Sequence, residues 1–183
     1  MSQTAEPKPP PHGPLPPKLE AHGAVFFDAE NRLLVVKTSY GTNAWGIPGG
    51  VAEVDESPRA TVRREVEEEI GLVKEPGALL VVAWQPARRR VLTARQRAEG
   101  WAERLPDGVQ LIFDGGVLTP VDIAAIKLDT EEIENYTFLY VDDAIERMDP
   151  LHARWTAAAV RARNTGRVVY LEDGLHGDGE RER

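Results

Sequence analysis

The chain has 183 residues, 42% of them hydrophobic and 28% charged, which is the composition of a globular protein with a sizeable core. Lys and Arg number 22 against 30 Asp and Glu, so the net charge is −8 and binding to nucleic acid polymers is disfavoured. We expect neither a membrane span nor a signal peptide, because no apolar run approaches the roughly 20 residues that cross a bilayer. The chain has no Cys, which excludes disulfides and thiol chemistry and is compatible with the cytoplasmic location that we predict.

Two tails flank the part of the chain that has core-forming residues. Prolines crowd residues 1–19, which predicts an extended Pro-rich tail that is solvated or lies along the surface; a ligand for a proline-binding module and a contact with a partner subunit are the alternatives. Residues 173–183 are rich in glycine and charge, and we predict that they form a flexible C-terminal tail. A single domain is therefore expected over residues 20–172.

Within that domain, strand-like and helix-like segments follow one another along the chain. Two short apolar runs at 23–28 and 32–37 predict a β-hairpin. Helical patterns occupy 58–70, 142–148 and 150–164, and further strands are predicted at 79–84, 109–113, 121–126 and 136–141. This order of elements predicts an α/β fold with a mixed β-sheet.

The helix predicted at 58–70 has local signals at both of its ends. Ser57 suits the N-cap, Pro58 suits the first helical position, and Gly71 suits the end of the helix. Between these signals, apolar side chains recur every fourth residue and form a stripe that can dock on a sheet: Val62, Val66 and Ile70.

Acidic side chains gather beside this stripe. At about 100° per residue, Glu65, Glu68 and Glu69 lie on one face of the helix, whereas Glu67 points away. Carboxylates three or four residues apart repel each other on a helix, and a hard divalent cation such as Mg²⁺ or Mn²⁺ reverses the sign of that interaction. The pattern therefore predicts a metal site, and a solvated acidic face is the alternative for an isolated cluster of this kind.

The residues around this cluster complete a longer pattern. From Gly50 to Leu72 the sequence resembles the Nudix box, G-x5-E-x7-R-E-U-x-E-E-x-G-U with U an aliphatic residue, and it departs from that pattern at no position. The matching residues are Gly50, Glu56, Arg64, Glu65, Val66, Glu68, Glu69, Gly71 and Leu72. A weaker resemblance continues at 45–50, 131–138 and 141–144.

The resemblance to Nudix hydrolases implies an α/β/α sandwich and a set of site residues. Glu56 and Arg64 resemble the supporting pair of the family. Glu132 is our choice for an acidic residue that joins the site from a distant loop, with Glu131 and Glu134 as rivals. The other implied ligands of Mg²⁺ or Mn²⁺ are the backbone carbonyl of Gly49 and the side chains of Glu65, Glu68 and Glu69.

The same resemblance implies a reaction on a small-molecule substrate. A water activated by the metal would attack phosphorus and cleave a diphosphate linkage in a nucleoside diphosphate derivative or a related small nucleotide. The general base would be Glu65 or a loop carboxylate such as Glu132. The alternatives are a non-catalytic nucleotide-sensing module of the same fold and a hydrolase of a non-nucleotide diphosphate. Many relatives are dimers, so a homodimer is compatible with the resemblance.

An Arg-rich stretch at 85–104 contrasts with the acidic character of the whole chain. Its first arginines, Arg88, Arg89 and Arg90, predict a flap that contacts substrate phosphates, and a solvated surface segment is the alternative. Trp84 and Trp101 suit either stacking on a base or ordinary packing.

Overall fold

The computed structural model describes residues 16–39, 45–89, 97–98, 100 and 102–176. The strands of the main sheet are β1 (Leu19–Phe27), β2 (Leu33–Thr38), β3 (Trp45–Gly46), β4 (Gly49–Val51), β5 (Leu79–Gln85), β8 (Gly108–Val117), β9 (Ile133–Leu139), β10 (Val169–Glu172) and β11 (Leu175–His176). The helices are α1 (Pro58–Ile70), α3 (Pro120–Ala125), α4 (Val141–Glu146) and α5 (Pro150–Thr165). A separate ladder joins β6 (Arg88–Arg89) to β7 (Arg104–Leu105).

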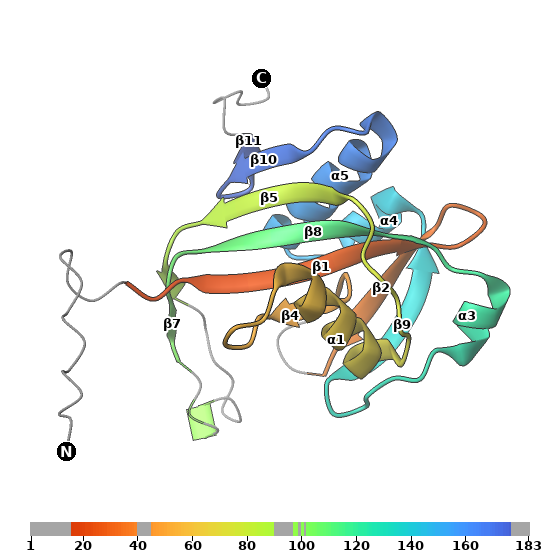
Figure 1. Ribbon diagram of the computed structural model, residues 1–183, viewed down its shortest axis with the longest axis horizontal. Helices are drawn as coiled ribbons and strands as arrows, with labels where there is room; N and C mark the ends of the chain where they lie inside the picture. Colours follow the sequence, from red (N-terminus) through yellow and green to blue (C-terminus); the bar gives the residue numbers. More distant parts are fainter. Residues whose placement is uncertain (1–15, 40–44, 90–96, 99, 101, 177–183) are drawn as a thin grey trace, which may run out of the picture.

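The main sheet is mixed, as the order of elements predicted. Within the described residues its strand order is β11-β10-β5-β8-β1-β2-β3, with β4 paired to β1 and β9 paired to β2. The pairs β1–β8 and β5–β10 are parallel, and the other pairs are antiparallel. Figure 1 shows α1 in front of the central strands and α4 and α5 behind them, so the expected α/β/α sandwich is confirmed.

Two apolar layers result from the alternation of side chains along the central strands. On β1, Val25 and Phe27 face the core that α5 closes with Trp155, whereas Ala24 and Phe26 face the core beneath α1. Each face of the strand is thereby covered by a different helix. None of the described helices is long and apolar enough to cross a membrane.

Helix α1 begins and ends where the sequence predicted. The Ser57 side chain accepts a hydrogen bond from the backbone N–H of Ala60, and Pro58 occupies the first helical position. At the other end, Gly71 has a φ of 72° and donates its N–H to the carbonyl of Glu67. The predicted apolar stripe is fully buried, with Val62, Val66 and Ile70 at 1%, 0% and 0% exposure.

The prediction of a strand at 121–126 is wrong, because α3 occupies this segment. Thr119 and Asp122 form a reciprocal capping box, in which each side chain accepts a hydrogen bond from the backbone N–H of the other. Pro120 then occupies the first helical position, and Lys74 forms an ion pair with Asp122 at 2.8 Å. No residue of α3 is fully buried, although Ile123 is partly buried against the core, and the capping box gives the segment a clear helix start.

The later elements differ from their predicted bounds by a few residues. The strand predicted at 136–141 is β9, which ends at Leu139, and Val141 begins α4. The sheet extends to His176 because β11 pairs with β10, so it includes the first residues of the segment that we predicted to be a tail. Residues 177–183 and residues 1–15 of the N-terminal tail lie outside the described residues.

The substitution Leu34→Ala tests how much the apolar core beneath α1 contributes to stability. The Leu34 side chain is 0% exposed, and Leu34→Ala is expected to lower the free energy of unfolding by about 2–5 kcal/mol, because a buried cavity replaces apolar contacts. Val54→Ala is the control, because Val54 is 93% exposed and should change stability by less than about 0.5 kcal/mol. Urea unfolding measures both, and equal midpoints would contradict this description of the core.

Candidate functional site

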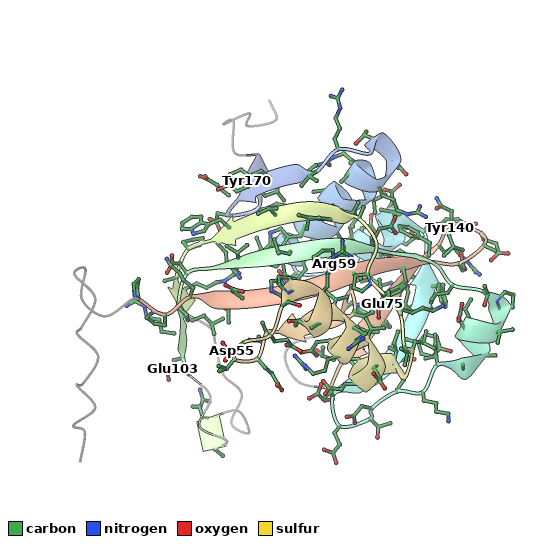
Figure 2. All side chains as sticks on the ribbon, in the orientation of Figure 1. Asp55, Arg59, Glu75, Glu103, Tyr140 and Tyr170 are labelled. Carbon is green, nitrogen blue, oxygen red and sulfur yellow. The ribbon has the colours of Figure 1, made fainter. Side chains whose placement is uncertain are left out.

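Two acidic side chains of α1 are buried against the sheet. Glu65 and Glu69 are 8% and 3% exposed, whereas Glu67 and Glu68 are exposed. Figure 2 shows where this helix starts, with Asp55 in the loop that precedes it and Arg59 in its first turn. As predicted, Glu67 points away from the site, and Glu68 lies at the exposed edge of the acidic face.

The backbone of two glycines lies directly against these carboxylates. Glu69 Oε2 accepts a hydrogen bond of 2.9 Å from the N–H of Gly49. A Cβ atom on Gly50 would lie 2.2 Å from Oε1 of Glu65, so Glu65 occupies the space that any other residue would need there. Gly49 has a φ of 147°, and a Cβ on it would lie 2.3 Å from the carbonyl oxygen of His22. Position 49 therefore requires glycine, whereas a side chain at position 50 would displace the Glu65 carboxylate.

Burial raises the pKa of both acids. For Glu69, burial raises the pKa from 4.5 to about 8; the Gly49 N–H opposes this shift, and the charges of Glu65 and Glu132 add to it. For Glu65, burial again raises the pKa, and the neighbouring Arg64 opposes the shift. Ionised carboxylates are therefore disfavoured here unless a positive charge is added.

Arg64 and Glu56 form the predicted bidentate pair beside the two acids. Arg64 Nε lies 2.9 Å from Glu56 Oε1, and Arg64 Nη2 lies 3.0 Å from Glu56 Oε2. This pairing lowers the pKa of Glu56 to about 2, with further hydrogen bonds from the Glu53 N–H and the Thr61 hydroxyl. The remaining nitrogen, Nη1, lies 3.0 Å from Glu65 and 2.7 Å from Glu68. Arg64 is therefore the counter-charge of the site.

The loop before β9 adds a further acidic group. Glu132 is exposed, and its charge is among the smaller causes that raise the pKa of both Glu65 and Glu69. Its rival Glu134 forms an ion pair with Lys37 at 2.9 Å. Neither Glu131 nor Glu134 is among the causes given for either shift, and the choice of Glu132 stays a prediction.

The chemical type of the ligands at this site fits a hard divalent cation, although the described residues do not form a complete coordination site. All the donors are oxygens, and two of them belong to buried acids, of which Glu65 has Arg64 3.0 Å away and Glu69 accepts a hydrogen bond from the Gly49 N–H. In the described parts of the chain, no group of three acidic or imidazole side chains is already arranged to hold a metal ion. Glu68 has a side chain that is 52% exposed, and ligation by it requires a turn away from Arg64.

The Arg-rich stretch contributes a small hairpin outside the main sheet. Arg88 and Arg89 form β6 and pair with β7, while Arg90 and Trp101 lie outside the described residues. Trp84 is partly buried on β5. A contact of these side chains with substrate stays a prediction.

Two residues of the site were missed by the sequence analysis. Thr61, 0% exposed, holds Glu56 through a 2.9 Å hydrogen bond, and its place next to the apolar stripe could have indicated this role. His22 is 1% exposed, lies opposite Gly50 in the sheet, and has no hydrogen-bond partner on either ring nitrogen among the described residues. Burial lowers its pKa, and no sequence signal distinguished it from the other histidines.

Comparison with known proteins identifies the class of protein that this fold and site define. The family model described as the NUDIX domain matches residues 17–159, so the chain belongs to the Nudix family. Among solved structures, the NUDIX domain of Shewanella oneidensis NrtR, in a complex with ADP ribose, aligns with a TM-score of 0.60 at 18% identity, covering 81% of this chain and 90% of that one. At this identity, the structural likeness shows the fold alone. Nudix hydrolases generally use divalent metal ions.

Two curated relatives share shorter stretches of sequence. A putative ADP-ribose pyrophosphatase of Bacillus subtilis is 41% identical over 66 residues, which cover 36% of this chain and 30% of the relative. Diphosphoinositol polyphosphate phosphohydrolase 3-alpha of Mus musculus is 33% identical over 87 residues, which cover 44% of this chain and 53% of the relative. The chain thus matches less than two thirds of the length of either relative.

Gly50 provides a test of the contact between the glycine pair and Glu65. Gly50→Ala is expected to push the Glu65 carboxylate out of place and to weaken Mn²⁺ binding by at least about tenfold, because a ligand loses its orientation. Gly46→Ala is the matched control, because a Cβ there would meet no atom within 4 Å. Titration calorimetry measures both affinities, and equal values would contradict the proposed contact.

Glu69 provides a test of the buried acid through pH. Because its pKa is raised from 4.5 to about 8 on folding, the metal-free protein has the full stability from this group below about pH 4.5 and loses it as the pH rises through 8. Glu69→Gln should remove this decline, whereas Glu67→Gln, at an exposed position, should keep it. Thermal unfolding in chelator between pH 5 and pH 9 measures the difference, and parallel curves for wild type and Glu69→Gln would refute the assignment.

Proposed function

We propose that the protein is a Nudix hydrolase that uses Mg²⁺ or Mn²⁺ to cleave a diphosphate linkage in a nucleoside diphosphate derivative or a related small nucleotide. The observation that carries this proposal is the burial of Glu65 and Glu69 against Gly49 and Gly50 within a complete Nudix box. A bound divalent ion supplies charge neutralisation for a diphosphate and lowers the pKa of a water molecule. Membership of the Nudix family and the names of the relatives support the reaction class.

The proposed ligands are Glu65, Glu68, Glu69, Glu132 and the carbonyl of Gly49. Glu69 is oriented by the Gly49 N–H, and Glu65 is confined by Gly50, so both carboxylates are positioned before any ligand arrives. Glu132 approaches from the loop before β9, which the backbone bond from the Ser39 N–H to the Glu132 carbonyl holds at 2.7 Å.

Arg64 and Glu56 have a supporting role in this proposal. The bidentate contact with Glu56 and a 3.1 Å hydrogen bond to the carbonyl of Val51 fix the guanidinium beside the acids. Arg64 can therefore neutralise Glu65 and Glu68 when no other cation is present, and it keeps its position when Glu68 turns away.

Glu65 and Glu132 are the two candidates for the general base. Burial raises the pKa of Glu65, which moves its proton affinity toward the range that suits a base near neutral pH. Glu132 lies in the loop before β9. The variant Glu132→Gln tests whether Glu132 or Glu65 is the general base. At saturating metal, a strong loss of turnover together with loss of the acidic limb of the pH–rate profile would assign the base to Glu132, whereas loss of metal affinity alone would assign it a ligand role.

The substrate class is proposed from the family, the relatives and the charge of the chain. One relative is described as a putative ADP-ribose pyrophosphatase, and another acts on diphosphoinositol polyphosphate according to its name. Arg88, Arg89 and Arg90 are proposed to contact substrate phosphates, because they form a local positive segment in a chain of net charge −8. A cytoplasmic location and a homodimer stay predictions from the sequence.

Turnover on a substrate panel tests the proposal and its main alternative together. With Mg²⁺ or Mn²⁺, the wild-type protein should cleave at least one nucleoside diphosphate derivative, and mass spectrometry of the products identifies the broken linkage. Glu69→Gln should still bind that substrate but lose at least about a hundredfold in kcat, because charge stabilisation of the transition state is lost. Glu67→Gln is the control and should retain the wild-type rate.

The outcomes distinguish three functions. Metal-dependent binding of nucleotides without any cleavage by the wild-type protein would support a nucleotide-sensing module instead. Cleavage of a diphosphoinositol polyphosphate alone would keep the reaction and replace the substrate class. Equal rates for wild type and Glu69→Gln would overturn the assignment of the site.

A further inference from the structure

One half of the sheet is covered by a helix on one face only. Strands β8, β5 and β10 pack under α5 on their buried face, through residues such as Ile112, Ala83 and Leu171. On the opposite face, Figure 1 shows α1 in front of β1 and β4 but not in front of β5 and β10. The cover ends near Phe113, where the guanidinium of Arg59 lies 5.2 Å from the centre of the ring.

Apolar and aromatic side chains continue across this uncovered face, which we call the open face. Tyr170 on β10 is 48% exposed and pairs in register with Val82 on β5, which pairs in turn with Leu111 on β8. Trp84, two residues after Val82, pairs with Val109. Figure 2 shows Tyr170 at the outer edge of this face. The open face is defined by Val82, Trp84, Val109, Leu111 and Tyr170.

The N-terminal segment enters the fold at one end of the open face. Leu19 pairs with Gly108, which pairs with Gln85 directly after Trp84. Asp107 links the start of β1 to β5, because its carboxylate accepts hydrogen bonds from the side chains of Lys18 and Trp84. Residues 1–15 therefore continue from a point beside Trp84.

We propose that residues 1–15 of the same chain bind in an extended conformation along the open face, across Trp84 and Tyr170. Proline-rich segments favour the polyproline II conformation and bind to aromatic surfaces at a low cost in entropy. The prolines of this segment are Pro7, Pro9, Pro10, Pro11 and Pro14. The proposal does not depend on the activity of the site.

The length of the segment agrees with this occupant. Fifteen residues in the polyproline II conformation extend about 45 Å, which exceeds the width of three strands spaced about 5 Å apart. The segment carries one acid, Glu6, and one base, Lys8, so its binding rests on apolar and aromatic contact rather than on charge. Because the segment is tethered beside Trp84, its effective concentration is in the millimolar range, so a weak contact is sufficient.

The absence of Cys permits a direct test in the full chain. Thr4→Cys creates a single site for a nitroxide spin label, which broadens the NMR signals of nearby amides. At least a twofold loss of peak height is expected at Val82, Trp84 and Tyr170, while the amides of α3, at the far end of the molecule in Figure 1, keep their intensity. Uniform or absent broadening would overturn the proposal.

A variant and a mixed sample make the test specific. Tyr170→Ser should restore the peak heights at Val82 and Trp84, whereas Tyr140→Ser, which changes a tyrosine of 61% exposure at the start of α4, should leave the broadening unchanged. Retained broadening in Tyr170→Ser would contradict the proposed aromatic contact. In a mixture of unlabelled ¹⁵N chains and spin-labelled ¹⁴N chains, broadening as strong as within one chain would show that a second copy supplies the segment, which would also overturn the proposal.

Discussion

The burial of two carboxylates against glycine backbone is the constraint on which the candidate site depends. Removing Glu65 and Glu69 from water disfavours their charged forms, and the hydrogen bond from Gly49 offsets only part of that cost for Glu69. A surface cluster of acids would be solvated, and binding a cation would lower its free energy less. Burial converts the same residues into a site where added positive charge is favourable, and the guanidinium of Arg64 supplies it for Glu65 and Glu68.

The fold positions the two buried carboxylates by bringing β1 and the loop before β9 next to β4 and α1. Strand β4 returns to pair with β1, and the pairing of Gly49 with Gly23 sets the glycine backbone in front of α1. The buried stripe of α1 fixes the rotation of the helix and thereby directs Glu65 and Glu69 at β4. The loop before β9 is attached to the end of α1 by the bond from the Asp129 N–H to the Glu69 carbonyl, at 3.2 Å.

Elements whose conformation depends on neighbouring residues were predicted accurately from the sequence. Elements whose conformation depends on distant residues were predicted less accurately. Helix α1 was predicted at its full length because Ser57, Pro58 and Gly71 act within one turn of its ends. The strand expected at 121–126 is a helix because the capping box of Thr119 and Asp122 starts it, and Ile123 and Ile126 pack only partly against the core. Short apolar runs do not distinguish strand from helix by periodicity, and only the end signals distinguished them here.

The sequence by itself determined the class of the fold, the bounds of α1, and the presence of three glutamates on one side of that helix. These properties follow from local spacing and from end signals, which need no knowledge of distant residues. Tertiary structure alone decided that Glu65 and Glu69 are buried while Glu68 is exposed, that Glu134 pairs with Lys37, and that Thr61 supports Glu56. Burial and electrostatic environment depend on which segments meet in space, and that information is distributed over the whole sheet rather than encoded next to any one residue.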